Sequence, residues 1–315
     1  MLNSNKLLDY SIHQISLVDI DQKFCSTGYL IRDEKTVIIE TGTAPSNSKI
    51  HGLLKELEID PQEIDAIFVT HIHLDHSGGA GLLMQQCPNA TLYVHGRGIK
   101  HLVHPERLVE SAKFVYGKDY KALFDPVYPV DENRIVVIGE GEDFQIGKNR
   151  FLNVYDAPGH ALHHSFFFDT ASKGIFSGDS AGLYYQNLFY HQGVELCLPA
   201  TTPTQFDPKA MNQTLSKMMD LDPKCIYFTH FGASENAMEL LQQVKEWVPL
   251  FGEEGVEFFR SQKSLEDLTS FFRRRVNQWL EERNVALNSG GLQYLEYDLK
   301  LNAQGVIAYA QRLEK

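Results

Sequence analysis

The sequence predicts an α/β fold followed by a helical C-terminal region. Compact runs rich in β-branched and aromatic residues, such as 66–70 (AIFVT) and 134–139 (RIVVIG), predict strands. Apolar residues recur at helical spacing in segment 46–59 and in two longer stripes beyond residue 232. In addition, histidines and aspartates follow directly after several predicted strands, which is where open sheets usually place their chemistry.

Predicted strands recur through the first 180 residues. Three runs near the start are typical of an antiparallel meander: 11–20, 26–33 and 35–42. Further runs predict strands at 90–95, 142–147, 149–157, 164–170, 174–179 and 224–230. Residues 96–130 show mixed charge and no strand alternation, so we predict a helical insertion there that covers a cleft. Asp207 can cap a helix that begins at Pro208.

Charge and composition narrow the class of partner. The 315 residues carry a formal charge of −12, from 29 basic and 41 acidic side chains. A negative field repels phosphate and anionic lipid, so we expect a small-molecule substrate, no nucleic acid and no membrane. No run approaches the roughly 18 apolar residues that span a bilayer. We see no secretory signal, and the four cysteines form no CxxC pair, so we expect a cytoplasmic protein.

Residues 70–79 (THIHLDHSGG) concentrate side chains that bind metals. His71 and His73 are two positions apart, so both imidazoles point to the same side of an extended segment. Asp75 and His76 follow where the chain turns, and they can serve a second point nearby. Imidazole and carboxylate are the ligands of zinc, and also of iron or manganese. These four side chains would supply about half of a two-metal site.

Three further candidate ligands lie far along the chain, and each follows a predicted strand. His160 stands in APGH, Asp179 in SGD and His230 in TH. Three separate strands that each deliver one such residue are hard to produce by chance beside the histidine cluster. The sequence therefore predicts a metal site built from distant segments.

Over roughly residues 10–232, this combination resembles the metallo-β-lactamase-fold hydrolases, whose signature is HxHxDH followed by a distant His, Asp and His. The resemblance implies a four-layer αββα sandwich, with the metals at one edge between the two sheets. It implies a catalytic domain at 1–232, with the insertion at about 96–130, and a helical extension at 233–315 packed on it.

The resemblance also assigns the ligands of two divalent metal ions, with zinc expected and iron or manganese as alternatives. His71, His73 and His160 would hold one ion. Asp75, His76 and His230 would hold the second, and Asp179 would bridge both. Family members commonly have DTG in an early turn where this chain has ETG, so Glu40 is expected to support ligands through hydrogen bonds.

Some oxidoreductases of the family replace the second histidine of the motif with glutamate, so His73 favours hydrolysis. We expect a carboxylic ester, lactone or thioester to be attacked by a metal-bridging hydroxide, with Asp75 orienting it or moving its proton. Tyr184 follows Asp179 closely and could donate a hydrogen bond to an oxyanion, although core packing is an equal alternative. His163 and His164 are interpreted as residues that support the ligands or belong to a strand, rather than as ligands.

Other functions stay open at this point. One is a small-molecule phosphodiesterase on the same metal pair. Another is an iron-dependent sulfur dioxygenase, and a third is a protein that binds a ligand or partner without turning it over. The same ligand types serve all of these, so neither the substrate nor the metal follows from the motif alone. The sequence also leaves the oligomeric state open.

Overall fold

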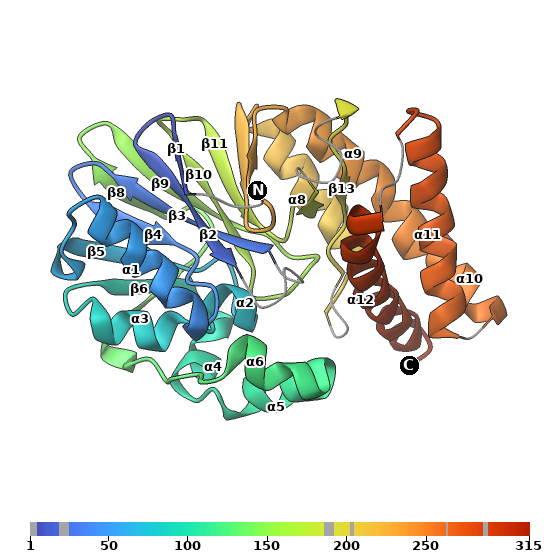
Figure 1. Cartoon of the computed structure of the whole chain (residues 1–315), viewed down its shortest axis with the longest axis horizontal. Coiled ribbons are helices and arrows are strands. Elements are labelled where there is room, and N and C mark those ends of the chain that lie inside the picture. Colours follow the sequence, from blue (N-terminus) through green and yellow to red (C-terminus); the bar gives the residue numbers. More distant parts are fainter. Residues whose placement is uncertain (1–4, 19–24, 186–191, 202–204, 263, 286–288) are drawn as a thin grey trace. The chain divides into compact units, whose positions relative to one another are not determined.

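The computed structural model describes residues 5–18, 25–185, 192–201, 205–262, 264–285 and 289–315 (Figure 1). The described chain forms two compact units. The first comprises residues up to 156, with 163–178 and 224–234. The second comprises 157–162, 179–223 and 235–315. The predicted domains, 1–232 and 233–315, stay a prediction.

The first unit contains two β-sheets. The larger has seven strands in sequence order: β1 (Lys6–Leu8), β2 (Ile12–Val18), β3 (Cys25–Arg32), β4 (Thr36–Ile39), β5 (Ile64–Phe68), β6 (Thr91–His95) and β7 (Ile135–Ile138). The first four strands pair antiparallel, which confirms the predicted meander, and β4 to β7 pair parallel. The last two residues of the run predicted at 11–20 lie outside the described residues.

The second sheet of this unit has six strands in the order β15-β14-β11-β10-β9-β8. Their bounds are β8 (Asp143–Gly147), β9 (Arg150–Asp156), β10 (Ser165–Asp169), β11 (Gly174–Gly178), β14 (Cys225–Phe228) and β15 (Ala233–Ser234). Only β11 and β14 pair parallel within it, and the other neighbours are antiparallel. Each predicted strand from 134 to 230 is therefore present.

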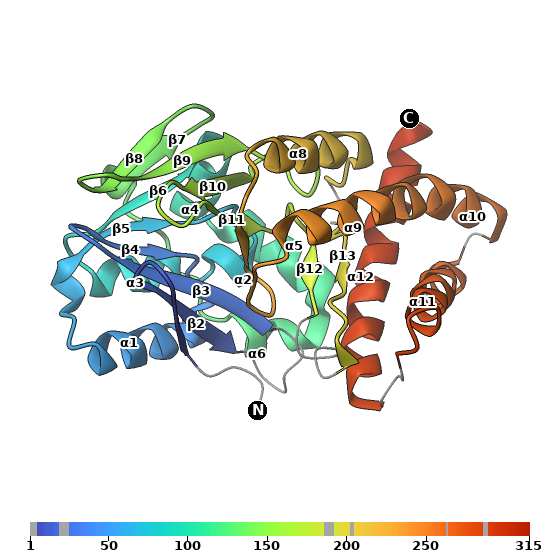
Figure 2. The same ribbon diagram turned by 90° about the horizontal axis from the view of Figure 1, so that it is seen from above.

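Strand alternation divides the core of the first unit into two layers. Tyr29 and Ile31 on β3 point into a cluster shared with the second sheet, whose residues include Phe167 and Phe176. Leu30, between them, belongs to a second cluster on the other side of the larger sheet. Helices α1 (Asn47–Glu56) and α3 (Ala80–Gln86) contribute to that second cluster and cover this face (Figures 1 and 2).

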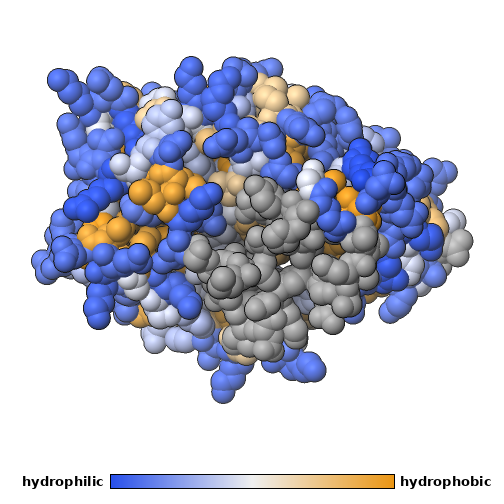
Figure 3. Space-filling model, turned by 45° about the horizontal axis from the view of Figure 1, so that its top comes forward, coloured by the Kyte–Doolittle hydropathy of each residue, from blue (hydrophilic) through white to orange (hydrophobic). Residues whose placement is uncertain are grey.

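Residues 96–130, for which the sequence predicts a helical insertion, contain three α-helices. They are α4 (Ile99–Val103), α5 (Glu106–Tyr116) and α6 (Tyr120–Phe124). Phe114 on α5 has 91% of its surface exposed, more than any other large apolar side chain described. Apart from the residues drawn in grey, the face in Figure 3 is mostly hydrophilic, with smaller apolar areas.

The second unit is mostly helical. Its helices are α8 (Pro208–Asp220), α9 (Ala237–Pro249), α10 (Gly255–Gln262), α11 (Leu265–Glu281) and α12 (Ser289–Leu313), and a π-helical segment (Leu250–Glu254) joins α9 to α10. The short strands β12 (Leu183–Tyr184) and β13 (Cys197–Leu198) pair with each other. Asp207 caps α8 as predicted, accepting hydrogen bonds from the backbone N–H groups of Lys209 and Ala210. None of the described helices is both long and apolar enough to span a bilayer.

Candidate metal centre

The predicted ligands of the first unit stand just beyond the ends of two strands. The chain leaves β5 at Phe68, bends at Thr70 and His71, and reaches His73, whose backbone is extended. It then enters a four-residue helix, α2 (Leu74–Ser77), which carries Asp75 and His76. His230 follows β14. This unit therefore holds five of the seven predicted ligands.

His71 and His73 direct nitrogens toward one point. His71 Nε2 lies 2.8 Å from His73 Nδ1. His71 Nδ1 lies 3.1 Å from Thr70 Oγ1, whose only hydrogen is donated to Glu40 Oε1. Thr70 must then accept from His71 Nδ1–H, so the Nε2 of a neutral His71 keeps its lone pair. That tautomer is the one a metal at this point requires.

A second group lies beside the first within the same unit. Asp75, His76 and His230 each offer a ligand atom within 4.8 Å of the others. Asp75 Oδ2 is 3.5 Å from His76 Nε2 and 3.5 Å from His230 Nε2. The His76 side chain is completely buried, whereas the Asp75 side chain keeps 15% of its surface exposed. Two imidazoles and one carboxylate form a donor set that fits a divalent ion such as zinc.

Glu40 connects the two groups. This buried residue accepts hydrogen bonds from the backbone N–H of Thr70, at 3.2 Å, and from its hydroxyl. Its other oxygen, Oε2, lies 3.4 Å from His76 Nδ1. A carboxylate in that position favours the Nδ1–H tautomer of His76 and leaves Nε2 available to a metal. The role expected of Glu40 in supporting the ligands stays a prediction.

The second unit carries the other two predicted ligands, His160 and Asp179. His160 Nδ1 donates a hydrogen bond of 2.8 Å to the carbonyl oxygen of Ala200, which can only accept. His160 Nε2 therefore keeps its lone pair, and it lies 3.3 Å from Asp179 Oδ2. Within this unit, an imidazole and a carboxylate are thus prepared to bind the same cation.

The structure reveals supporting residues that the sequence analysis did not single out. Thr70 links Glu40 to His71, and Thr41 donates two hydrogen bonds of 2.9 Å, from its N–H and its hydroxyl, to the carbonyl oxygen of His76. Both threonines adjoin motif residues, which is the only sequence signal for them. His164 stacks on His71 with ring centroids 4.6 Å apart, and its role stays a prediction.

Tyr184, the predicted oxyanion donor, lies on β12 with its side chain completely buried. Its hydroxyl donates to Glu195, which also accepts a hydrogen bond from Asn236. The adjacent Tyr185 donates to Asp298 over 2.7 Å, and burial, reinforced by that carboxylate, raises the pKa of Tyr185 well above its usual value. The catalytic role of Tyr184 stays a prediction. It would require the Tyr184 hydroxyl to give up its hydrogen bond to Glu195.

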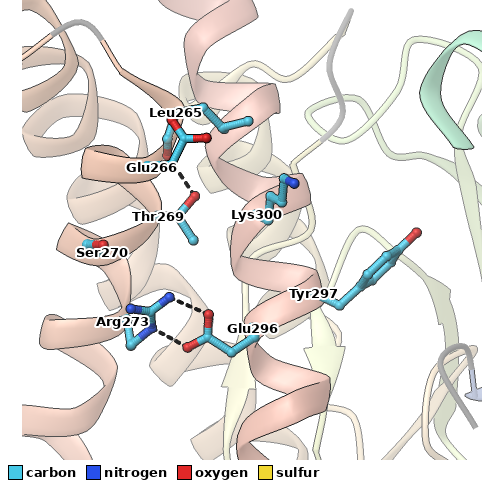
Figure 4. Close-up of a pocket in the computed structure, with 8 residues that line it drawn as sticks. All are labelled: Leu265, Glu266, Thr269, Ser270, Arg273, Glu296, Tyr297 and Lys300. Carbon is cyan, nitrogen blue, oxygen red and sulfur yellow. Dashed lines mark hydrogen bonds and ion pairs between the residues drawn. The ribbon is translucent and has the colours of Figure 1, made fainter. Parts of the chain in front are cut away.

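A groove in the second unit lies between α11 and α12 and is lined by eight residues (Figure 4). Arg273 and Glu296 form an ion pair across it through two hydrogen bonds. No predicted site residue lines this groove.

The sequence and the fold together define the class of protein. Residues 21–230 match the family profile of the metallo-beta-lactamase superfamily, and the chain belongs to that superfamily. It has the metallo-β-lactamase fold, with mixed sheets and helices and a C-terminal helical region, as predicted.

Two archaeal comparisons cover most of the chain. It is 30% identical over 225 residues to a metallo-beta-lactamase fold-containing protein of Sulfurisphaera tokodaii, which covers 70% of this chain and 78% of that protein. A solved structure of an archaeal superfamily protein from Sulfolobus tokodaii aligns with a TM-score of 0.68 at 22% identity, covering 95% of this chain and 99% of the other.

Other similar proteins have names that indicate redox chemistry. The anaerobic nitric oxide reductase flavorubredoxin of Vibrio vulnificus is 29% identical over 162 residues, or 50% of this chain, but the match spans only 27% of that longer protein. The flavodiiron protein of Giardia intestinalis aligns with a TM-score of 0.56 at 16% identity, over 80% of this chain and 61% of the other. The latter likeness is one of fold.

Proposed function

We propose that this protein is a dinuclear metal-dependent hydrolase of a carboxylic ester, lactone or thioester. The observation that carries the proposal is the pair His71 and His73, whose Nε2 and Nδ1 atoms lie 2.8 Å apart. A histidine at position 73 distinguishes the chain from family oxidoreductases that have glutamate there. Membership of a superfamily of mostly metal-dependent enzymes supports the same function.

We propose that ligands from both units complete the centre. One ion would be held by His71, His73 and His160, the second by Asp75, His76 and His230, and Asp179 would contact both. The tautomers described for His71, His76 and His160 support this assignment, because each leaves Nε2 as the unprotonated nitrogen. Zinc suits these donors, and iron or manganese are the alternatives.

Bound divalent cations would supply Lewis acidity and make a water molecule nucleophilic near neutral pH. Residues of the chain would accept the proton and stabilise the oxyanion. Asp75 is the proposed proton acceptor, because its carboxylate keeps 15% of its surface exposed at the group that includes His230. Tyr184 is a proposed oxyanion donor once its hydroxyl leaves Glu195.

A second candidate is an iron-dependent oxidoreductase such as a sulfur dioxygenase. The 29% identity over 162 residues to the anaerobic nitric oxide reductase flavorubredoxin of Vibrio vulnificus supports an oxidoreductase. A small-molecule phosphodiesterase remains a third possibility on the same donors. We further propose a cytoplasmic location, supported by the thiols of Cys87 and Cys197, which form no disulfide.

The first experiment is to measure the metal content of the purified protein and its proton release with lactones, esters, thioesters and one phosphodiester. Turnover confined to the acyl substrates supports the hydrolase. Turnover of the phosphodiester alone supports the third candidate. Three results together would favour the iron-dependent oxidoreductase over the hydrolase. The protein would contain iron, it would hydrolyse none of these substrates, and it would consume oxygen when a persulfide is added.

Asp179→Ala tests the ligand assignment. We expect it to lose most activity together with bound metal, because the proposed bridge between the two ions is removed. Inductively coupled plasma mass spectrometry measures the loss. His95→Ala is the control, since His95 is outside the ligand set and its Nδ1 accepts from the backbone N–H of Arg97. Full metal occupancy and turnover in Asp179→Ala would contradict the assignment.

A further inference from the structure

Leu74 stands between His73 and Asp75, yet its side chain does not join the core behind the larger sheet. It is 3% exposed and belongs to a separate apolar cluster in the first unit. The other buried members all come from the helical insertion: Ala112, Tyr120, Leu123 and Phe124. In this cluster, the metal motif and the insertion are therefore packed together through Leu74.

The helix that carries Asp75 and His76 is too short to be stable alone. Within α2, the N–H of Gly78 donates to Leu74 O at 2.9 Å, and the N–H of Ser77 donates to His73 O at 2.9 Å. Thr41 fixes the backbone of the turn at His76 O. Leu74 provides an apolar attachment of α2, beside the polar contacts that Thr41 and Glu40 make with His76.

We infer that Leu74 is a positioning residue for metal binding, and that the insertion holds Asp75 and His76 in place through it. Metal–ligand distances tolerate displacements of only about 0.2 Å. A turn that loses its apolar anchor can shift by more than this. We therefore expect the affinity for the ion at Asp75, His76 and His230 to decrease first. The inference rests on the two-metal site proposed above and gives the insertion a role at that site.

Leu74→Ala tests the inference through metal affinity rather than activity. Competition with a chromophoric chelator should show two zinc equivalents in the wild type. We expect the variant to bind one of them at least about tenfold more weakly, in the range known for residues that orient ligands. The visible spectrum of the cobalt-substituted protein should lose the contribution of the same ion. Leu74→Met, which refills the space, should restore both equivalents.

Phe124→Leu perturbs the cluster from the insertion without touching the motif. It should weaken the same zinc equivalent as Leu74→Ala, and it carries the test if Leu74→Ala does not fold. The matched control is Leu102→Ala, because Leu102 lies on α4 and is also buried, at 5% exposure, but belongs to the core behind the larger sheet. It should reduce stability and leave both zinc affinities within about threefold.

The outcomes separate this inference from the proposed function. Two wild-type zinc equivalents that Leu74→Ala and Phe124→Leu bind equally tightly overturn the inference and leave the hydrolase standing. An equal loss in Leu102→Ala would also overturn it, since general destabilisation would then be the cause. A wild-type protein that binds two ions but hydrolyses nothing overturns the hydrolase alone. A wild-type protein that binds no second ion overturns both.

Discussion

Glu40 shows how one buried side chain can prepare two groups of ligands. Its Oε1 accepts both hydrogen bonds from Thr70, and its Oε2 faces Nδ1 of His76. Glutamate reaches both partners from a backbone with φ of +67°, a conformation that L-residues rarely adopt. The longer side chain in the ETG turn is thus compatible with an intact site.

Replacing Glu40 with glutamine should weaken metal binding by about 10- to 100-fold. The amide oxygen would stay with Thr70, because Thr70 offers two donors there. The amide N–H group would then face His76 Nδ1 and favour the tautomer with a hydrogen on Nε2, which cannot bind a metal. Chelator competition measures the affinity, and Glu110→Gln, on the exposed face of α5, is the control. Equal affinities in the two variants would contradict this reasoning.

His95 should make the protein less stable at mildly acidic pH. Burial lowers the pKa of His95, Asp156 opposes this, and Arg97 adds to it. The unfolded chain therefore takes up a proton first as the pH falls below about 6.5, so stability decreases until folded His95 is also protonated. His95→Asn should flatten the fall of the melting temperature between about pH 7 and pH 5. An unchanged pH profile in that variant would assign the fall to other groups.

At the scale of elements, the candidate ligands His71, His73 and His230 follow the ends of strands β5 and β14. The sequence indicates most of the strands, because runs such as IVVI in β7 are compact and apolar. It does not indicate α2, since a single helical turn has no periodicity to detect. The β12–β13 pair is also missing from the sequence analysis, because each strand has only two residues and depends on its partner.

Arg134 stabilises the C-terminal end of α3 through hydrogen bonds that no local sequence pattern predicts. Its guanidinium donates three hydrogen bonds of 2.6 Å to the carbonyl oxygens of Met84, Cys87 and Ala90, at and after the end of α3. Arg134→Met should lower the free energy of unfolding by about 2–4 kcal/mol, because charged hydrogen bonds are lost and carbonyls are left unsatisfied. Urea denaturation measures it. Arg107→Met, at an exposed position of α5, should change it by less than about 0.5 kcal/mol.

For the whole molecule, stability should depend on metal. The proposed ligands are widely separated in the sequence, so an ion would bind the native state in preference to the unfolded one. A free metal concentration of 100 times Kd would add about 2.7 kcal/mol per site. Removal of metal with a chelator should therefore lower the melting temperature by several degrees, as scanning calorimetry would show. Asp179→Ala should respond little, and an unaffected wild type would contradict a metal centre.

The sequence by itself determined the family, the strand pattern and the candidate ligands, because these depend on residue type and short spacing. The HxHxDH motif can be recognised within six residues, and the apolar pattern of each strand within a similarly short segment. Only the tertiary structure showed that Thr70 and Glu40 set the tautomers of His71 and His76, and that Leu74 packs with the insertion. The contacts of Glu40 with Thr70 and His76, and of Leu74 with the insertion, join residues about 30 to 50 positions apart. Hydrogen bonding and packing at such separations follow from the fold of the backbone, which no short window of sequence contains.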